Sequence, residues 1–251
     1  MRPFGFFSLG TVKPQNMIDS DDPENADATE AIDNLEPGQT IGYQRKTHTL
    51  FIEPETIGKT VDFKTIFGND QPVELEVGSG KALFLRNAAK ERPNHNFYGI
   101  EIVRKYAFHG ADRVKNLGLT NVKIMPGDAL GFLKKVPDRN IVTVHLYYPD
   151  PWWKRKHHKR RVFTTEFVRD VQRVLVDLGQ FLIVTDVADY FEHVELLMTE
   201  FPEFERQSVP ESHEPVHDLD YLTNFERKFR QEGRPIYRVA YLRKARLENG
   251  L

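Results

Sequence analysis

From about residue 72 onward, short runs of apolar residues alternate with segments whose apolar residues recur at helical spacing. The apolar runs predict strands over residues 73–77, 97–102, 122–125, 141–147 and 180–185. The helical patterns fall over 81–91 and 104–117, from 129, over 165–178, and from 188. Because strands that alternate with helices of this length form a parallel sheet covered on both faces, we expect a doubly wound α/β fold.

The two ends of the chain follow different patterns. Residues 236–243 alternate apolar and polar positions, which predicts a strand with one wetter side, as in an antiparallel edge. Residues 1–40 have no sustained period and are rich in Asp, Asn, Pro and Gly. We therefore predict a disordered acidic arm over 1–40 and a single domain over 41–251.

Charge is distributed unevenly along the 251 residues, although the net charge is only -2. Residues 16–37 hold eight acids and no Lys or Arg, and without them the chain has 35 bases against 29 acids. The chain has no Cys, which excludes disulfide scaffolds, thiolate metal sites and Cys nucleophiles and fits a reducing compartment. The N-terminal apolar stretch, residues 4–9, is too short to span a membrane, so we expect a cytoplasmic protein without a membrane partner.

Acidic residues stand near the ends of the first three predicted strands. The first strand carries Glu76 and runs into Gly78 and Gly80, whose spacing lets the backbone pass close beneath a ligand. Glu101 ends the second strand, where an acid accepts ribose hydroxyls of a nucleoside cofactor, and Asp128 follows the third, placed to accept from an adenine amine. Because ligands of such sheets bind at the carboxyl ends of the strands, this pattern predicts a nucleoside-cofactor site.

Charge distinguishes between the classes of nucleoside cofactor. A dinucleotide carries a pyrophosphate, which Glu76 would repel, and Ala82 stands where a dinucleotide turn usually has its third glycine. The same carboxylate favours the ammonium and sulfonium groups of S-adenosylmethionine. We therefore expect S-adenosylmethionine rather than NAD.

The fourth predicted strand runs into Pro149-Asp150-Pro151-Trp152, which resembles a nucleobase pocket. The prolines fix the backbone around Asp150, and Trp152 offers a flat surface for a base. Six basic residues follow within eight positions, namely Lys154, Arg155, Lys156, Lys159, Arg160 and Arg161, and residues 151–165 include no acidic residue. A purely basic run favours phosphate binding over a solvated helix face, and its two histidines lack further ligands at metal spacing. We expect a nucleic-acid partner and no metal.

Together, these motifs resemble those of the bacterial tRNA (guanine-N7)-methyltransferases. The segments that carry the resemblance span roughly residues 70–245 and are Glu76-Val-Gly-Ser-Gly80, Gly99-Ile-Glu101, Gly127-Asp-Ala129, Pro149-Asp-Pro-Trp-Trp-Lys154, His158-Lys-Arg-Arg161, Thr185-Asp186 and Thr223-Asn-Phe-Glu226. The resemblance implies a class I, Rossmann-like fold with a mostly parallel seven-stranded sheet and an antiparallel C-terminal strand. It also implies methyl transfer from S-adenosylmethionine to N7 of a tRNA guanine, at position 46 in the variable loop.

The resemblance further implies roles for individual residues. Glu76, Glu101 and Asp128 bind the methyl donor around the turn of Gly78 and Gly80. Asp150 falls at the active-site aspartate of the family, also near the donor. The implied substrate contacts are Lys154, Asp186, Thr223, Asn224, Phe225 and Glu226.

The expected chemistry assigns Asp150 an orienting role. Guanine N7 carries a free lone pair, so no base has to remove a proton before the methyl group arrives. Asp150 is expected to accept hydrogen bonds from guanine N1–H and N2–H and to favour the developing positive charge on the purine. An aromatic wall for the unstacked base, Trp152 or Phe225, is also expected.

Three other functions share some of these features. The alternative is an exocyclic amino-methyltransferase acting on another RNA or DNA base, because those enzymes have an Asp/Asn-Pro-Pro-aromatic motif that Asp150-Pro-Trp resembles. A dehydrogenase needs a pyrophosphate-friendly turn and a hydride-transfer acid–base pair, and neither is evident. An RNA-binding module without catalysis explains the basic run but not the three acids. The sequence leaves open whether the protein is a monomer or a homodimer.

Overall fold

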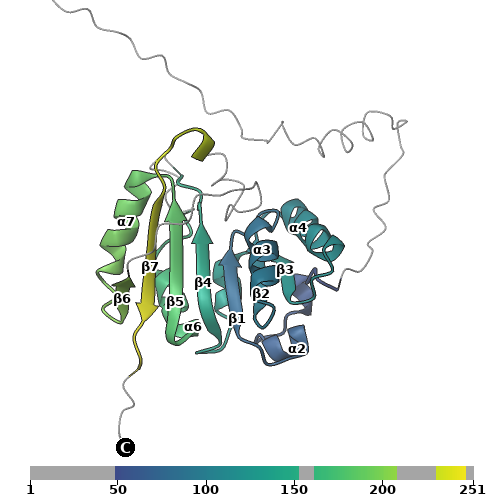
Figure 1. The fold of residues 1–251 in the computed structure, drawn as a ribbon. Coiled ribbons are helices and arrows are strands. Elements are labelled where there is room, and N and C mark those ends of the chain that lie inside the picture. Colours follow the sequence, from purple (N-terminus) through teal and green to yellow (C-terminus); the bar gives the residue numbers. More distant parts are fainter. Residues whose placement is uncertain (1–48, 153–160, 208–229, 247–251) are drawn as a thin grey trace, which may run out of the picture. The chain divides into compact units, whose positions relative to one another are not determined.

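One sheet of seven strands organises the described part of the chain. The computed structural model describes residues 49–152, 161–207 and 230–246, so the predicted arm over 1–40 lies outside the described residues. The strand order is β3-β2-β1-β4-β5-β7-β6 (Figure 1). The strands are β1 (Val73–Val77), β2 (Asn96–Glu101), β3 (Val122–Pro126), β4 (Ile141–Tyr147), β5 (Leu175–Thr185), β6 (Phe204–Gln207) and β7 (Tyr237–Arg243). Only β7 runs antiparallel to its neighbours, which confirms the predicted mostly parallel sheet with an antiparallel C-terminal strand.

Helices cover both faces of this sheet. They are η1 (Pro54–Thr56), α2 (Phe63–Phe67), α3 (Leu83–Glu91), α4 (Arg104–Asn116), α5 (Ala129–Leu133), α6 (Thr165–Val174) and α7 (Ala188–Met198). On one face α3 and α4 bury residues such as Leu85 and Ala111. On the other face α5, α6 and α7 contribute Phe132, Phe167 and Tyr190 to a second core cluster. Among the described residues, no helix has the length and apolar character needed to cross a bilayer.

The central strands are buried along their whole length or nearly so. All five residues of β1 and all six of β2 are buried. A strand that is covered on both faces reads as a continuous apolar run rather than as an alternating one. β1 departs from this expectation, since Glu74 and Glu76 are buried within it, yet β1 and β4 begin and end at the residues that the sequence predicted.

The helix predicted over 165–178 is wrong at its C-terminal end. α6 ends at Val174, and the residues from Leu175 onward belong to β5. Apolar residues at 171, 174, 175 and 178 continue the helical spacing, but Leu175 pairs with Ile141 on β4, and Leu178 is left-handed with φ 65°. Pairing with β4 therefore overrides the local helical pattern at these positions.

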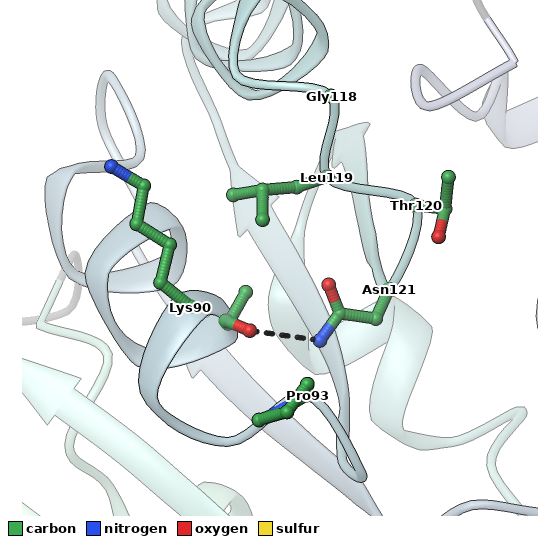
Figure 2. Close-up of a pocket in the computed structure, with 7 residues that line it drawn as sticks. Lys90, Pro93, Gly118, Leu119, Thr120 and Asn121 are labelled. Atoms are coloured by element: carbon green, nitrogen blue, oxygen red, sulfur yellow. Dashed lines mark hydrogen bonds between the residues drawn. The ribbon is translucent and has the colours of Figure 1, made fainter.

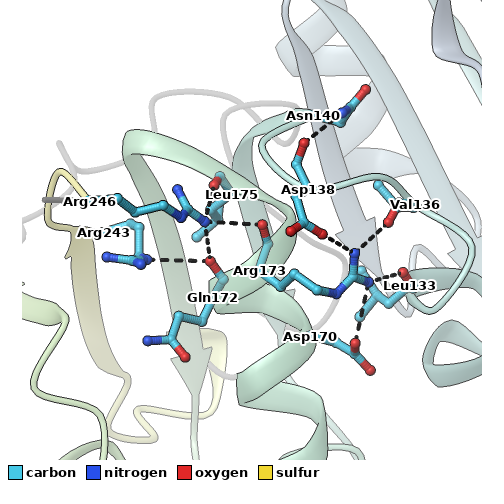
Figure 3. A network of polar contacts seen from close by, with 10 residues as sticks. All are labelled: Leu133, Val136, Asp138, Asn140, Asp170, Gln172, Arg173, Leu175, Arg243 and Arg246. Carbon is cyan, nitrogen blue, oxygen red and sulfur yellow. Dashed lines mark hydrogen bonds and ion pairs between the residues drawn. The ribbon is translucent and has the colours of Figure 1, made fainter. Parts of the chain in front are cut away.

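Two arginines fasten α6 at the amino-terminal edge of the parallel strands (Figure 3). Arg173 donates to the carbonyl oxygens of Leu133 and Val136, both at 2.7 Å. Arg246, beyond β7, donates to three carbonyl oxygens at the end of α6, those of Gln172, Arg173 and Leu175, at 2.9, 3.1 and 3.1 Å. The last carbonyls of a helix lack partners within the helix, and Arg246 adds a charged donor to those at the end of α6.

Candidate active site

A tight turn joins β1 to α3 at the carboxyl edge of the sheet. Gly78 and Gly80 have φ of 80° and 51°, and Ala82 is also left-handed, so α3 begins only at Leu83. The amides of Gly78 and Ser79 both donate to the carbonyl oxygen of Ile100, at 2.8 and 3.0 Å. A Cβ at either glycine would meet no atom within 4 Å, so the space over the turn is open to a ligand.

Gly99 on β2 lets this turn lie against the sheet. A Cβ at Gly99 would lie 2.5 Å from Leu85 Cδ1 and 2.8 Å from Ser79 Oγ. Both distances are too short for any side chain at this position. The glycine therefore allows α3 and the turn to approach β2 closely.

Glu101 ties the end of β2 to the turn. One carboxylate oxygen accepts from the Gly80 amide and the other from the Val103 amide, both at 2.8 Å. Burial raises the pKa of Glu101 and nearby Asp150 adds to the rise, while the two backbone hydrogen bonds oppose it. An ionised carboxylate has about four acceptor positions, so Glu101 keeps capacity for ribose hydroxyls.

Glu76 is a buried acid whose hydrogen bonding is incomplete. It is 3% exposed, and its Oε2 has no hydrogen-bond partner among the described residues. Burial raises the pKa of Glu76 well above its ordinary range, and repulsion from Glu101 adds to this. A buried unpaired polar atom costs about 1–3 kcal/mol, which a hydrogen-bonding cation at this position would offset.

Asp150 is held on a constrained loop after β4. Tyr148 and Trp152 on either side of it are left-handed, with φ of 48° and 44°, and the Tyr148 amide donates to the Val184 carbonyl oxygen at 2.7 Å. Asp150 is exposed as a residue, yet partial burial of its carboxyl group raises its pKa. Its charge acts on Glu101, so the structure brings the ends of β2 and β4 to one place. Backbone strain of this kind is concentrated at functional sites.

Asp128 lies at the same edge and caps a helix there. Its carboxylate accepts from the amides of Leu130 and Gly131, at 3.3 and 2.8 Å, at the start of α5. The residue is exposed, so its remaining acceptor positions face solvent. Its predicted contact with an adenine amine stays a prediction.

Besides Asp150 and Trp152, two predicted nucleic-acid contacts are described, and both already have partners. Asp186, beyond β5, forms an ion pair with Arg234, which lies before β7. Arg161 donates through Nε to the Pro151 carbonyl oxygen at 2.8 Å and places its guanidinium 5.4 Å from the centre of the Tyr190 ring. The other predicted contacts lie outside the described residues; they are Lys154, Arg155, Lys156, Lys159, Arg160, Thr223, Asn224, Phe225 and Glu226.

Three residues at this edge were not identified from the sequence. Ser79 is buried between the two glycines, and its hydroxyl has no hydrogen-bond partner among the described residues. Ile102, next to Glu101 in the chain, is 71% exposed. Arg234 lies 48 residues from Asp186 in sequence. The predicted strand range, 97–102, included Ile102, whereas β2 ends at Glu101 and leaves Ile102 exposed.

Two surface hollows among the described residues lie elsewhere. One is lined by the ends of α3 and α4, including Lys90, Leu119 and Asn121 (Figure 2). There the Asn121 side-chain amide donates to the Ala89 carbonyl oxygen at 3.2 Å. A second hollow includes Pro72 and Asn140 and lies at the amino ends of β1 and β4. Both are at the edge opposite the carboxylates, and no group of three or more metal-binding side chains occurs among the described residues.

Known proteins with similar sequences include several that are named tRNA (guanine-N(7)-)-methyltransferase. A family model described as "Putative methyltransferase" matches residues 70–239. A solved SAM-dependent methyltransferase structure from Aquifex aeolicus is similar with a TM-score of 0.48 and 14% identity, covering 74% of this chain and 91% of that chain. A tRNA (guanine-N(7)-)-methyltransferase of Rhodopirellula baltica is 43% identical over 199 residues, which cover 76% of this chain and 73% of that one. One of Vibrio cholerae is 35% identical over 213 residues, covering 84% and 88%. By the family model and these identities, the chain belongs to the tRNA (guanine-N7)-methyltransferase family.

Proposed function

We propose that this protein transfers the methyl group of S-adenosylmethionine to N7 of a guanine in tRNA. The observation that supports this most is the group of carboxylates from Glu76, Glu101 and Asp150 around the glycine turn. Burial raises all three pKa values, repulsion from Glu101 adds to the rise at Glu76, and repulsion from Asp150 adds to the rise at Glu101. A cationic ligand relieves this repulsion, whereas a pyrophosphate would add to it. The site therefore suits a donor that carries an ammonium and a sulfonium group.

The residues present fit this cofactor. The unpartnered oxygen of Glu76 suits the ammonium group, and the remaining lone pairs of Glu101 suit the ribose hydroxyls. Ile102 offers an apolar surface to the adenine ring, and Asp128 an acceptor to its amine. When bound, the cofactor supplies an electrophilic methyl group on a sulfonium.

Asp150 orients the base in this proposal. It accepts from guanine N1–H and N2–H, and its negative charge favours the positive charge that develops on the purine. Holding the reacting atoms in line contributes as much as roughly 7–11 kcal/mol in well-aligned systems, so positioning is the main source of acceleration. Arg234 holds Asp186 in place at the end of β5, where Asp186 contributes to base recognition.

We further propose that the target guanine is at position 46 in the variable loop and that the basic run ending at Arg161 binds tRNA phosphates. The resemblance of Pro149 to Lys154 and of His158 to Arg161 to the family motifs supports both statements. Phosphate contacts fix the register of the RNA, and the base pocket then reads the guanine. Replacing Arg160 and Arg161 by Ala is expected to flatten the dependence of log affinity on log salt by about 0.7–0.9 per lost contact.

The test is a nucleoside map. Unmodified tRNA is incubated with labelled S-adenosylmethionine, digested, and the labelled nucleoside identified; the result expected is 7-methylguanosine. A tRNA with adenine in place of guanine 46 is the control for position and is expected to take no label. A label on an exocyclic amine would contradict N7 transfer, and persistent label in the control tRNA would contradict position 46. Asp150→Asn is the matched protein control and is expected to lower the rate by orders of magnitude while still binding S-adenosylhomocysteine.

A further inference from the structure

A buried polar cluster lies on the α3 side of the sheet, and the proposed reaction does not use it. Glu74 on β1 is 3% exposed and His145 on β4 is 2% exposed. His145 Nε2 lies 2.7 Å from Glu74 Oε2, and its Nδ1 lies 2.8 Å from the hydroxyl of Tyr147. Arg92 and His95 also bond the Glu74 carboxylate, at 3.1 and 2.8 Å. Both ring nitrogens of His145 therefore have partners.

Hydrogen bonds connect the members of this cluster in one chain and shift the pKa values of two of them. Burial raises the pKa of Glu74, but the hydrogen bonds and charges of His145, Arg92 and His95 outweigh it and leave the pKa below its ordinary value. Burial lowers the pKa of His145, and the hydrogen bond and charge of Glu74 oppose this shift. An ionised carboxylate only accepts, so Nε2 donates to Glu74, and Nδ1 forms the second hydrogen bond of the ring with the Tyr147 hydroxyl. The hydrogen-bonded chain thus runs from Tyr147 through His145 to Glu74.

This chain ends where the candidate active site begins. Tyr147 is the last residue of β4, and the strained Tyr148 and then Asp150 follow it. Phe84, in the first turn of α3, packs on both rings, with centroids 4.5 Å from that of His145 and 5.0 Å from that of Tyr147. The cluster therefore links β1, the start of α3 after the glycine turn, and the end of β4.

We propose that His145 and Tyr147 are positioning residues for methyl transfer. They fix the end of β4 and so hold Asp150 at one position relative to the glycine turn. The inference rests on the proposed function for its effect on rate. Stability alone does not call for such a cluster, since apolar replacement of a buried ion pair is often neutral or stabilising. Directional hydrogen bonds, in contrast, allow only one register of β4 against β1.

The decisive variant is Tyr147→Phe, which removes one hydroxyl and keeps the ring against Phe84. The loss of this hydrogen bond corresponds to a roughly three- to tenfold change in a rate or equilibrium constant. We expect kcat for tRNA methylation to fall by that factor, with the KM for tRNA and the affinity for S-adenosylhomocysteine within twofold of wild type. The Tyr148 amide, which bonds the Val184 carbonyl oxygen, is expected to exchange its hydrogen faster by the same factor. Tyr241→Phe, at a buried tyrosine on β7, is the matched control and is expected to change neither quantity.

Conservative and disruptive changes at His145 separate positioning from general stability. His145→Asn keeps an acceptor near the place of Nδ1 and is expected to retain more of the wild-type kcat than His145→Leu, with both rates measured per folded molecule. Wild-type kcat together with wild-type exchange at Tyr148 in Tyr147→Phe would overturn the proposal. The exchange measurement needs neither donor nor RNA, so it decides the positioning role even where tRNA methylation itself fails.

Discussion

Replacing Gly99 by Ala tests how the glycine turn is held against β2. The new Cβ would lie 2.5 Å from Leu85 Cδ1, where ordinary carbon contacts begin near 3.4 Å, so one of the two groups must shift by almost 1 Å. Leu85 is fully buried, and the next nearest atoms are Oγ and Cβ of Ser79 in the turn itself, at 2.8 and 3.0 Å. Overpacking of this kind costs about 1–3 kcal/mol.

The expected results follow from where the strain is relieved. For a domain of this size each kcal/mol lowers Tm by roughly 2–4 °C, so Gly99→Ala should melt roughly 2–12 °C below wild type in a thermal scan. Displacing Ser79 also shifts Gly80 away from Glu101, and the loss of that charged hydrogen bond should weaken S-adenosylhomocysteine binding by about tenfold, measured by calorimetry. Gly58→Ala is the matched control, since its Cβ would meet only the Thr60 carbonyl oxygen at 3.8 Å. A Gly99→Ala protein with the melting temperature and affinity of wild type would refute the close approach.

Further predictions concern the acids of the site. Two variants, Asp128→Ala and Thr164→Ala, each remove a helix cap and should lower the free energy of unfolding in urea by about 0.5–2 kcal/mol. Only Asp128→Ala should also weaken S-adenosylhomocysteine binding. Equal affinities of the two variants would contradict the assignment of Asp128 to the donor site. Because burial and Glu101 raise the pKa of Glu76 in the folded state, the folded protein keeps this proton to a higher pH than the unfolded chain does. The free energy of unfolding of the wild type should therefore fall as pH rises from 4.5 through the raised pKa. Glu76→Gln should lack this pH dependence, so the free energy of unfolding of the variant should rise relative to that of the wild type as pH rises. A difference between the two proteins that stays constant across pH would contradict the raised pKa.

Strands could be predicted from the sequence where burial alone decides them. The predicted and observed ends of β1 and β4 coincide, although β1 includes Glu74 and Glu76 and β4 includes Thr143 and His145. β6 could not be predicted, because Phe204 is its only apolar residue and its strand character comes from pairing with β7, more than 30 residues later in the chain. The start of β5 was missed for a related reason, since its pairing with β4 is invisible to a local pattern.

The acids of the site could be located from the sequence because each stands at or near the end of a strand. Their partners could not. Glu101 was expected to face ribose hydroxyls, but its bonds to the Gly80 and Val103 amides depend on how the turn closes. The pairing of Glu74 with His145, 71 residues apart, requires β1 and β4 to be neighbours in the sheet, and no spacing within either strand indicates it.

The place of β7 between β5 and β6 has a consequence for synthesis of the chain. While the protein leaves the ribosome, β1 to β5 can pair with one another, but the outer edge of β5 stays open until Arg243 at the end of β7 has emerged. An open strand edge is a template for pairing with other chains, so the nascent domain is exposed to aggregation until its last strand arrives. Release of a chain cut short before Tyr237 should therefore yield aggregates rather than a smaller folded domain.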